Sequence, residues 1–447
     1  MRIAFIVDRF PVLSETFVIN QITGLIERGH EVHIYGRQTY DNKVHPDVEK
    51  YELIKRTRYL PEIPNNYLVR LFNTLYLFAK NFSQAPLVLL RSLNIFKYGK
   101  RAACLRLFYS TLPFLNAPEY DIIHCQFGRQ AVCKFGPYSY EGLVLREIGA
   151  VKGKLITTFR GYDISWYLKK YGENVYDGLF EQGDFFYTNC EFFRQRVIKL
   201  GCDEKKIIVH GSGINCSRFT FKARYPDAEG LIRIATTGRL VEKKGIEYAI
   251  RAIADVVKVH NNVEFNVIGD GELKERFAQI INELNLADKV HLKGWKNQKE
   301  IISILDKSHI FVAPSVTASD GNQDAPVNTL KEAMAMGLPV IGTFHGGIPE
   351  LVEDGVSGFL VPERDEKAIA QKLIYLIEHP EIWSQMGSHG RQKVEENYDT
   401  DKLNSELVEI YQQVLSNDLY ELEEASQISQ TPSEYSGATK TNPASAG

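Results

Sequence analysis

The chain has 447 residues, of which 44% are hydrophobic and 24% are charged, the balance of a globular enzyme and not of a disordered or fibrous protein. This length predicts two large domains. The formal net charge of −3 at pH 7 gives no overall attraction for nucleic acid, and we expect no nucleic-acid partner. Arg70 and Lys80 interrupt the best candidate for a membrane span. The six cysteines include no C-x-x-C pair, which indicates the reduced thiols of a cytoplasmic protein.

The first half of the chain alternates short apolar runs with amphipathic stretches. Residues 3–7 are apolar and β-branched, residues 15–29 are amphipathic, and residues 31–36 form a second run, which together predict a β-α-β unit. Further strand-like runs follow at residues 121–127, 154–159, 184–189 and 206–213. This alternation predicts an α/β fold with a parallel, doubly wound sheet.

The same pattern begins again after the polar segment 223–230. Its strand-like runs are residues 232–238, 264–269, 289–294, 309–315, 339–343 and 358–362. A second doubly wound sheet is therefore expected, followed by a charged helix and by a polar end rich in Ser, Thr, Pro and Gly that predicts disorder. The predicted division is a first Rossmann-like domain over 1–222, a second over 230–395, a C-terminal helix over 396–416 and a disordered tail over 417–447.

Two loops that follow predicted strands bear on cofactor binding. The loop DRFPVLSETF after the first strand contains no glycine, which argues against a dinucleotide-binding dehydrogenase. Gly269 and Gly271, in the sequence GDG, follow another strand and either form a tight turn or face a ligand. We keep both glycines as candidates for ligand binding.

Two cations follow the first strand of the second predicted sheet. Arg239 and Lys244 lie in TTGRLVEKKG, just beyond the carboxyl end of that strand, where open α/β sheets bind ligands. Cations fixed there suit a diphosphate leaving group. The alternative is that both are solvated charges at the start of a helix.

A pair of acidic residues follows further along the chain. Asp324 precedes Glu332 by eight residues, and Pro326 suits the first turn of a helix, so Asp324 is expected at or just before a helix N-terminus that favours anions. Eight helical steps of about 1.5 Å would separate the two carboxylates by roughly 12 Å. This exceeds the roughly 5 to 9.5 Å of a glycosidase pair and suits two ends of one long donor. Alternatively, Asp324 caps the helix and Glu332 faces solvent. Glycines in the same region let a ligand approach the backbone: Gly337, Gly346 and Gly347.

Over about residues 1–415 the chain resembles a family 4, retaining glycosyltransferase of GT-B fold, of the colanic-acid and exopolysaccharide type. The segments that carry the resemblance are FPVLSETFVINQITGLIERGHEV, GRLVEKKG, GDGEL, FVAPS, KEAMAMGLPVI, GGIPELV and DGVSGFLV. The resemblance implies two Rossmann-like domains that face a cleft. The second would bind a nucleotide-diphosphate sugar, and the first would bind a carbohydrate or lipid-linked acceptor.

The resemblance also implies roles for single residues. Arg239 and Lys244 would hold the diphosphate, Glu332 the ribose hydroxyls, and Asp324, where the motif commonly carries glutamate, the sugar. Further donor-binding candidates are Gly269, Gly271, Pro326, Val327 and Asn328. No carboxylate is assignable as a nucleophile, so we expect retention by front-face return, with the leaving phosphate accepting the acceptor's proton and with its charge stabilised by the cations and by helix N-termini.

Four residues of the first domain are candidates for contact with the acceptor or the sugar. Arg160 stands where relatives commonly carry a histidine that faces the donor sugar. His124 resembles the family's strand-end histidine, although a histidine beside a strand end is commonly packed and hydrogen-bonded. Ser14 and Glu15 lie in the N-terminal signature.

Two other functions fit the same architecture: a sugar-nucleotide epimerase, and a catalytically silent carbohydrate-binding subunit. The presence of Arg239, Lys244 and Glu332 argues against the silent subunit. We expect no cofactor and no required metal, because no histidine–carboxylate cluster has metal-ligand spacing and Asp399, in the triplet DTD, predicts a helix cap.

Residues 55–106 form a basic stretch in which aromatic and aliphatic residues alternate with lysines and arginines. Either the apolar residues cover the domain's own sheet, or the segment docks on an anionic membrane. The second interpretation places a cytoplasmic protein on the inner face of the membrane.

Overall fold

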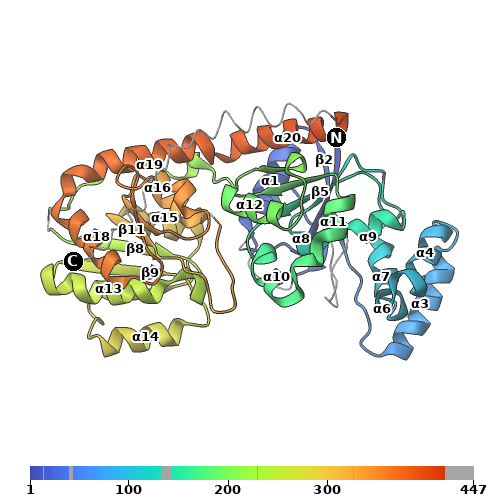
Figure 1. Ribbon diagram of the computed structural model, residues 1–447, viewed down its shortest axis with the longest axis horizontal. Coiled ribbons are helices and arrows are strands. Elements are labelled where there is room, and N and C mark those ends of the chain that lie inside the picture. Colours follow the sequence, from blue (N-terminus) through green and yellow to red (C-terminus); the bar gives the residue numbers. More distant parts are fainter. Residues whose placement is uncertain (14, 40–43, 132–141, 229, 326, 418–447) are drawn as a thin grey trace, which may run out of the picture.

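The computed structural model describes residues 1–417 except 14, 40–43, 132–141, 229 and 326. The candidates Ser14 and Pro326, and the predicted tail from residue 418 onward, lie outside the described residues. Figure 1 shows two α/β domains side by side, with the last two helices running from the second domain across to the first. The predicted pair of parallel, doubly wound sheets is confirmed.

The first domain is built on seven parallel strands in the order β3-β2-β1-β4-β5-β6-β7. The strands are β1 (Arg2–Phe10), β2 (Glu31–Gln38), β3 (Thr57–Tyr59), β4 (Ile122–Cys125), β5 (Lys154–Phe159), β6 (Phe185–Thr188) and β7 (Ile207–Val209). Its helices, besides five in the arm described below, are α1 (Thr16–Glu27), α2 (Pro46–Lys50), α8 (Gly128–Ala131), α9 (Gly142–Glu147), α10 (Trp166–Tyr171), α11 (Asp177–Gln182) and α12 (Glu191–Lys199). The strands form because their apolar, β-branched runs are buried on both faces, as parallel sheets require.

The second domain is built on six parallel strands in the order β10-β9-β8-β11-β12-β13. The strands are β8 (Ile232–Thr237), β9 (Val263–Ile268), β10 (Val290–Gly294), β11 (Ile310–Ala313), β12 (Val340–Thr343) and β13 (Phe359–Val361). The helices are α13 (Ile246–Val259), α14 (Lys274–Glu283), α15 (Gln298–Asp306), α16 (Asn328–Ala335), α17 (Ile348–Leu351) and α18 (Glu366–Glu378). Helices α13, α14 and α18 pack with one hydrophobic core, and α16 and α17 pack with another.

Helices α19 (Trp383–Asn397) and α20 (Thr400–Ser416) join the two domains. Leu407 and Tyr411 of α20 pack with Val18 and Ile22 of α1 in the core of the first domain. Asp399 caps α20 by accepting hydrogen bonds from the backbone of its first turn, as its sequence context predicts. The last described helix thus packs on the domain in which the chain began. The domain boundaries predicted from the sequence remain predictions.

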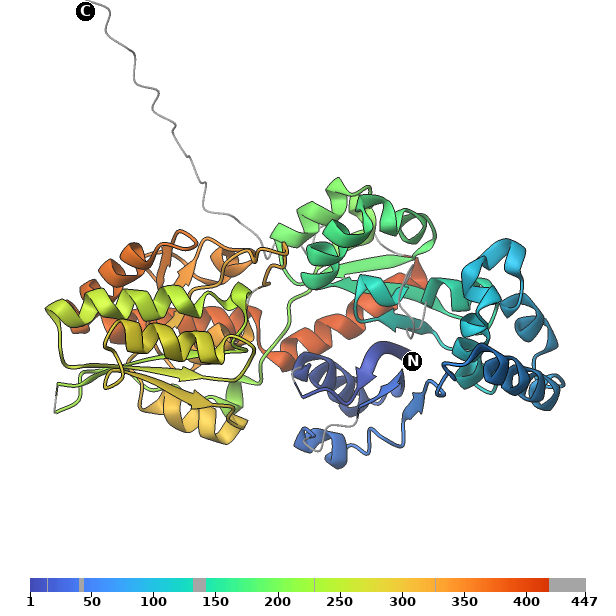
Figure 2. The same cartoon turned by 90° about the horizontal axis from the view of Figure 1, so that it is seen from below.

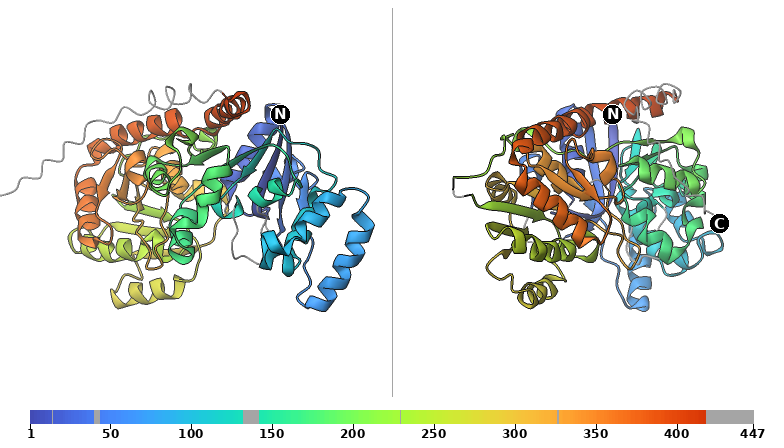
Figure 3. Two further views of the ribbon diagram at one scale, coloured as in Figure 1. Left: turned by 45° about the vertical axis from the view of Figure 1, so that its right-hand side comes forward. Right: turned by 60° about the vertical axis from the view of Figure 1, so that its left-hand side comes forward.

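Five helices form an arm at the far side of the first domain, seen at the right of Figures 1 and 2. They are α3 (Tyr67–Asn81), α4 (Pro86–Ser92), α5 (Ile95–Tyr98), α6 (Lys100–Ala103) and α7 (Arg106–Thr111). The turned views of Figure 3 show that α3 stands away from the sheet. A small core that includes Leu89 and Phe108 holds the arm together. No helix of the described part of the chain has the length and apolar character needed to cross a membrane.

Candidate functional site

The site expected from the sequence lies at the carboxyl ends of β8 and β11. These neighbouring strands mark the point where the strand order of the second sheet reverses, because β8 also pairs with β9 on its other side and β11 with β12. Connections there leave in opposite directions and open a crevice for ligands. A pocket lies at this point, lined by Thr236, Thr237, Lys244, Ile246, Ala313, Pro314, Ser315, Val327 and Thr329.

Asp324 and Lys244, which were expected at two different groups of the donor, contact each other directly. Lys244 Nζ lies 2.7 Å from Asp324 Oδ2, and Lys243 Nζ lies 2.9 Å from Asp324 Oδ1. The hydroxyl of Ser315 adds a hydrogen bond to Oδ2 at 3.2 Å. The two lysines outweigh the effect of burial and hold the pKa of Asp324 well below its usual range. The carboxylate is therefore ionised, and the two lysines neutralise its charge.

Asp324 lies just before a helix, as expected, but it does not cap that helix. Helix α16 begins at Asn328, and its N-cap is Val327, without a side-chain cap. Asp324 thus precedes the N-cap by three residues, so it is neither a cap nor part of the first turn, and the separation of roughly 12 Å for eight helical steps does not apply. The two candidates Val327 and Asn328 do lie at the N-terminus of this helix.

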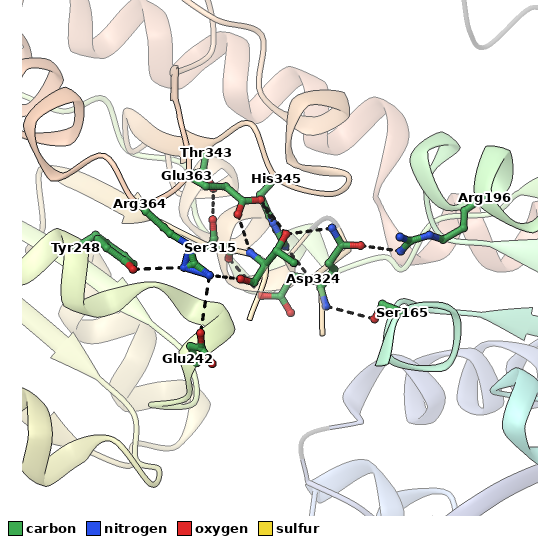
Figure 4. A network of polar contacts seen from close by, with 12 residues as sticks. Ser165, Arg196, Glu242, Tyr248, Ser315, Asp324, Thr343, His345, Glu363 and Arg364 are labelled. Carbon is green, nitrogen blue, oxygen red and sulfur yellow. Dashed lines mark hydrogen bonds and ion pairs between the residues drawn. The ribbon is translucent and has the colours of Figure 1, made fainter. Parts of the chain in front are cut away.

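A buried histidine positions Asp324 instead of the helix. The backbone N–H of Asp324 donates to His345 Nε2 at 2.9 Å, and His345 Nδ1 lies 2.6 Å from Glu363 Oε1 (Figure 4). Since Nε2 accepts, the proton resides on Nδ1, which donates to Glu363. Gly346 has a φ of +51°, and a Cβ there would lie 2.1 Å from the carbonyl oxygen of Asp324. The absence of a side chain at Gly346 therefore lets the backbone of Asp324 approach closely. It is not needed to admit a ligand.

Glu332 lies half-buried on α16, so it is not a freely solvated residue. Burial raises its pKa to about 7, against the opposing effect of Lys331. Lys331 is buried, and its Nζ donates to the carbonyl oxygen of Ser212 in the first domain at 2.6 Å and lies 4.3 Å from the Tyr398 ring centre. Sequence reasoning missed Lys331. The only available signal was that two charged residues, Lys331 and Glu332, stand between the apolar Leu330 and Ala333.

Arg239 is exposed at the loop that follows β8. Gly269 and Gly271 support this loop from the neighbouring strand. A Cβ at Gly269 would lie 1.9 Å from the Gly238 carbonyl oxygen, and one at Gly271 would lie 2.5 Å from that of Leu240. Close packing against the loop that carries Arg239 therefore explains why both positions are glycine, without a ligand.

The candidates in the first domain differ in their access. Glu15 is half-buried, and burial raises its pKa to about 7. Two arginines of the first domain, Arg129 and Arg160, and Arg239 of the second domain oppose that shift. The Arg160 guanidinium is buried, donates to Ser212 Oγ at 2.7 Å and to Gln126 Oε1 at 2.9 Å, and stacks on Phe17. Burial lowers the pKa of Arg160 to about 10.

His124 lies in the core of the first domain. Its side chain is buried, with Nδ1 2.6 Å from the Tyr411 hydroxyl and Nε2 2.7 Å from Thr158 Oγ1. Both ring nitrogens thus have protein partners. This is the packed and hydrogen-bonded position named as the alternative to a sugar-facing one.

Contacts between the domains converge beside Asp324. The backbone N–H of Gln323 donates to Ser165 Oγ at 3.3 Å, and its side-chain oxygen accepts from Arg196 at 2.7 Å (Figure 4). The carboxylate of Glu350 accepts hydrogen bonds from the backbone N–H groups of Glu191 and Phe192, at the start of α12. Sequence reasoning named neither Gln323 nor Glu350 as a contact between domains. Among the residues that the structure describes, no group of three His, Cys, Asp or Glu side chains is placed to hold a metal ion.

Comparisons with known proteins agree with this geometry. Residues 217–393 match the protein family described as Glycosyl transferases group 1. The amylovoran biosynthesis glycosyltransferase AmsK of Erwinia amylovora is 34% identical over 84% of this chain and 90% of its own. The chain is a group 1 glycosyltransferase. WcaL of Escherichia coli (strain K12), provisionally named a colanic acid biosynthesis glycosyltransferase, is 34% identical to this enzyme over 92% of the chain and 100% of its own.

Solved structures share the fold of this glycosyltransferase. A glycosyltransferase from Rickettsia africae ESF-5 has a TM-score of 0.64 and 20% identity over 93% of this chain and 99% of its own. Anabaena Alr3699/HepE in complex with UDP-glucose has a TM-score of 0.65 and 17% identity over 92% of this chain and 100% of its own. The two-domain GT-B architecture implied by the sequence is thereby confirmed.

Proposed function

We propose that this glycosyltransferase moves a sugar, with retention, from a nucleotide-diphosphate sugar to a carbohydrate or lipid-linked acceptor during exopolysaccharide synthesis. The observation that carries the proposal is the position of Lys244, which lines the pocket at the strand-order reversal of the second sheet. The names of AmsK and WcaL, which refer to amylovoran and colanic acid, support the exopolysaccharide product. The UDP-glucose bound by Alr3699/HepE supports the class of donor.

In the proposed reaction, two cations stabilise the leaving group. The bond between the anomeric carbon and the donor phosphate breaks, and Arg239 and Lys244 stabilise the charge that develops on the phosphate. The acceptor oxygen attacks the same face of the sugar, and its proton passes to the departing phosphate oxygen. Glu332 accepts hydrogen bonds from the ribose hydroxyls. The first domain supplies the acceptor site, in which the charge of Glu15 interacts with that of Arg239 of the second domain.

A donor screen tests the proposal. UDP-, GDP-, ADP- and TDP-sugars are added singly to the whole chain and the melting temperature is measured, since a true donor stabilises the folded state by mass action. Transfer is then assayed with that donor and lipid extracts as acceptor. Lys244→Ala and Glu332→Gln should each lower kcat/KM at least tenfold, which is about 1.4 kcal/mol. Lys258→Ala, on the solvent side of α13, is the matched control.

Two further outcomes separate this proposal from its alternatives. Turnover of the donor in the absence of acceptor, with inversion at one sugar carbon, would indicate the epimerase. Donor binding without turnover under any acceptor would indicate the silent subunit. A chelator should leave transfer intact, because we propose a site that works without a metal ion, and a complete loss that magnesium restores would contradict that part.

We also propose that the arm docks the enzyme on the cytoplasmic face of an anionic membrane. Phe96 is 97% exposed and Phe72 is 69% exposed. Other exposed apolar residues of the arm are Tyr67, Leu68, Val69, Leu75, Tyr76, Phe82, Leu87, Leu90 and Ile95. A large exposed apolar surface favours binding to a partner or a membrane. Docking there would bring the acceptor site to lipid-linked substrates.

The cations of the arm contribute less to this surface than the sequence suggests. Arg70 is buried and donates to the carbonyl oxygens of Pro64 and Cys104 at 2.8 and 2.9 Å. Lys97 pairs with Glu147 at 2.6 Å. The alternative that the apolar residues of this segment cover the domain's own sheet does not hold for the exposed ones. We therefore propose that apolar insertion contributes more to docking than charge does.

A further inference from the structure

The Asp324 carboxylate is shared by two adjacent lysines that differ in their surroundings. Lys244 lines the pocket, whereas Lys243 is not among the residues that line it. The Lys243 side chain is 12% exposed and that of Lys244 is 18% exposed. Lys243 Nζ also lies 3.4 Å from Asn322 Oδ1, on the segment that leads to Asp324. Lys244 is thus the cation that a ligand in the pocket meets first.

The backbone fixes both lysines and Asp324, so that only side chains need to move. The carbonyl oxygen of Lys243 accepts a hydrogen bond from Val316 N–H at 2.9 Å. Gly245 follows with a φ of +60°, and a Cβ there would lie 1.8 Å from the Pro314 carbonyl oxygen. The turn at Gly245 therefore packs tightly against the chain that follows β11. His345 holds the backbone of Asp324 from the other side.

We propose that Lys243 is a positioning residue, which keeps Asp324 neutralised while Lys244 turns from Asp324 to the donor diphosphate. The inference rests on the proposed function, since it requires a diphosphate in the pocket. A buried carboxylate that loses its partner is strongly destabilised. With a single lysine, donor binding would have to break the Lys244–Asp324 pair and leave Asp324 in that state. With two lysines, Lys243 remains on Asp324 and the exchange leaves no buried charge without a partner.

The same inference changes the role of Asp324. Its oxygens contact Lys243, Lys244 and Ser315, so it acts on the donor through Lys244 and not as the acceptor of sugar hydroxyls that the resemblance implies. Aspartate is one methylene shorter than the glutamate common at this position. That length seats the carboxylate between the two ammonium groups.

Isothermal titration calorimetry with UDP, GDP, ADP and TDP tests the exchange, using the diphosphate that wild type binds most tightly. Lys243→Met should weaken its Kd at least tenfold, because Lys244 then stays on Asp324. Lys243→Arg should remain within threefold of wild type. Adding Asp324→Asn to Lys243→Met should restore most of the affinity. Lys258→Met, an exposed pair partner of Asp255 on α13, should bind like wild type.

The variants separate this role from others. Unchanged binding in Lys243→Met overturns the inference, and so does a double variant that stays weak, because Lys243 would then bind phosphate itself. Asp324→Asn alone gives a second test that does not require Lys243→Met to fold. It should bind the diphosphate and its sugar conjugate at least as tightly as wild type, and a selective loss for the sugar conjugate would show direct sugar contact. Wild type that binds none of the four diphosphates would refute the proposed function, and this inference with it.

Discussion

Arg196 of the first domain donates a hydrogen bond to the side-chain oxygen of Gln323 in the second domain, at 2.7 Å. Gln323 directly precedes Asp324, and the side-chain nitrogen (Nε2) of Gln323 donates to Thr317 Oγ1 at 3.1 Å. The segment that carries Asp324 is therefore anchored in both domains. The Gln323 side chain therefore links the approach of the domains to the placement of Asp324, beside the hydrogen bond from the Gln323 backbone to Ser165.

We expect Arg196→Ala to lower kcat/KM about three- to tenfold, because a small misplacement of a catalytic segment costs rate without costing much stability. The melting temperature should stay within about 2 °C of wild type. Arg194→Ala is the matched control, since it lies on the same helix but pairs with Glu191 and Glu204 of its own domain. An equal loss of activity in both variants would contradict the coupling.

The hydrogen bonds of His345 predict a large effect on stability. His345→Leu removes the acceptor of the Asp324 N–H and the donor to Glu363 together. The Asp324 N–H is then buried without a partner, which costs about 1–3 kcal/mol, so the free energy of unfolding should fall by about that amount. Glu363 keeps its hydrogen bonds from the backbone N–H and the hydroxyl of Thr317. Urea denaturation measures it. His389→Leu, at a partly exposed site on α19, should change it by less than about 1 kcal/mol, and a similar loss there would show that the effect is not local.

The raised pKa of Glu332 predicts a dependence on pH. Burial raises the folded-state pKa to about 7, above the roughly 4.3 of an unfolded glutamate. The folded state binds the extra proton, so the free energy of unfolding should fall as pH rises from about 4.3 to 7 and level off above. Glu332→Gln should remove this part of the slope, which urea denaturation at several pH values would show.

Nucleotide affinity should change in the opposite sense, because only the ionised Glu332 accepts two ribose hydroxyls well. Affinity for the bound diphosphate should rise about three- to tenfold from pH 6 to pH 8, within the change in the ionised fraction for a pKa near 7. Glu332→Gln should bind weakly at both values. Burial lowers the pKa of Lys331 to about 7, so Lys331→Met serves as control. If that variant loses the pH dependence and Glu332→Gln keeps it, the assignment is wrong.

The fold could be predicted because its signals are local. Runs such as residues 3–7 and 232–238 are apolar over the length of a strand, and the structure forms β1 and β8 there. In an open parallel sheet of this kind, ligands bind beyond the carboxyl ends of the strands. This located Lys244 and Arg239 at the correct edge of the correct sheet, although nothing local indicated that Lys244 contacts Asp324.

The details of the site depend on residues distant in sequence. Asp324 is held by His345 and by Lys243, neither of which a helix pattern around Pro326 can indicate. His124 is satisfied by Tyr411, 287 residues away. Glu350 caps a helix of the other domain. The contacts of Asp324 and His124 exist only once the chain around them has folded, and that of Glu350 only once the two domains meet. This is why the sequence alone predicted candidates and not their partners.

The arm predicts membrane binding that salt weakens only in part. We expect the enzyme to co-sediment with vesicles that contain anionic lipids. Because Arg70 and Lys97 are engaged within the protein, about 0.5 M salt should release only part of the bound enzyme, whereas a purely electrostatic surface would be released fully. We expect the exposed rings to insert their apolar surface at the headgroup boundary, a contribution that salt does not screen.

Phe72→Asn combined with Phe96→Asn should lower the bound fraction at least threefold and leave nucleotide affinity unchanged. The arm lies at the far side of the first domain (Figure 1), whereas the pocket is lined by residues of the second domain. The matched control is Tyr225→Asn combined with Val259→Asn, which removes exposed apolar residues outside the arm. Equal loss in both pairs would show a general effect of removing exposed apolar side chains. Light scattering without vesicles completes the test: a dimer that the Phe72 and Phe96 changes dissociate would assign the arm to self-association, because a face buried between two copies is closed to lipid.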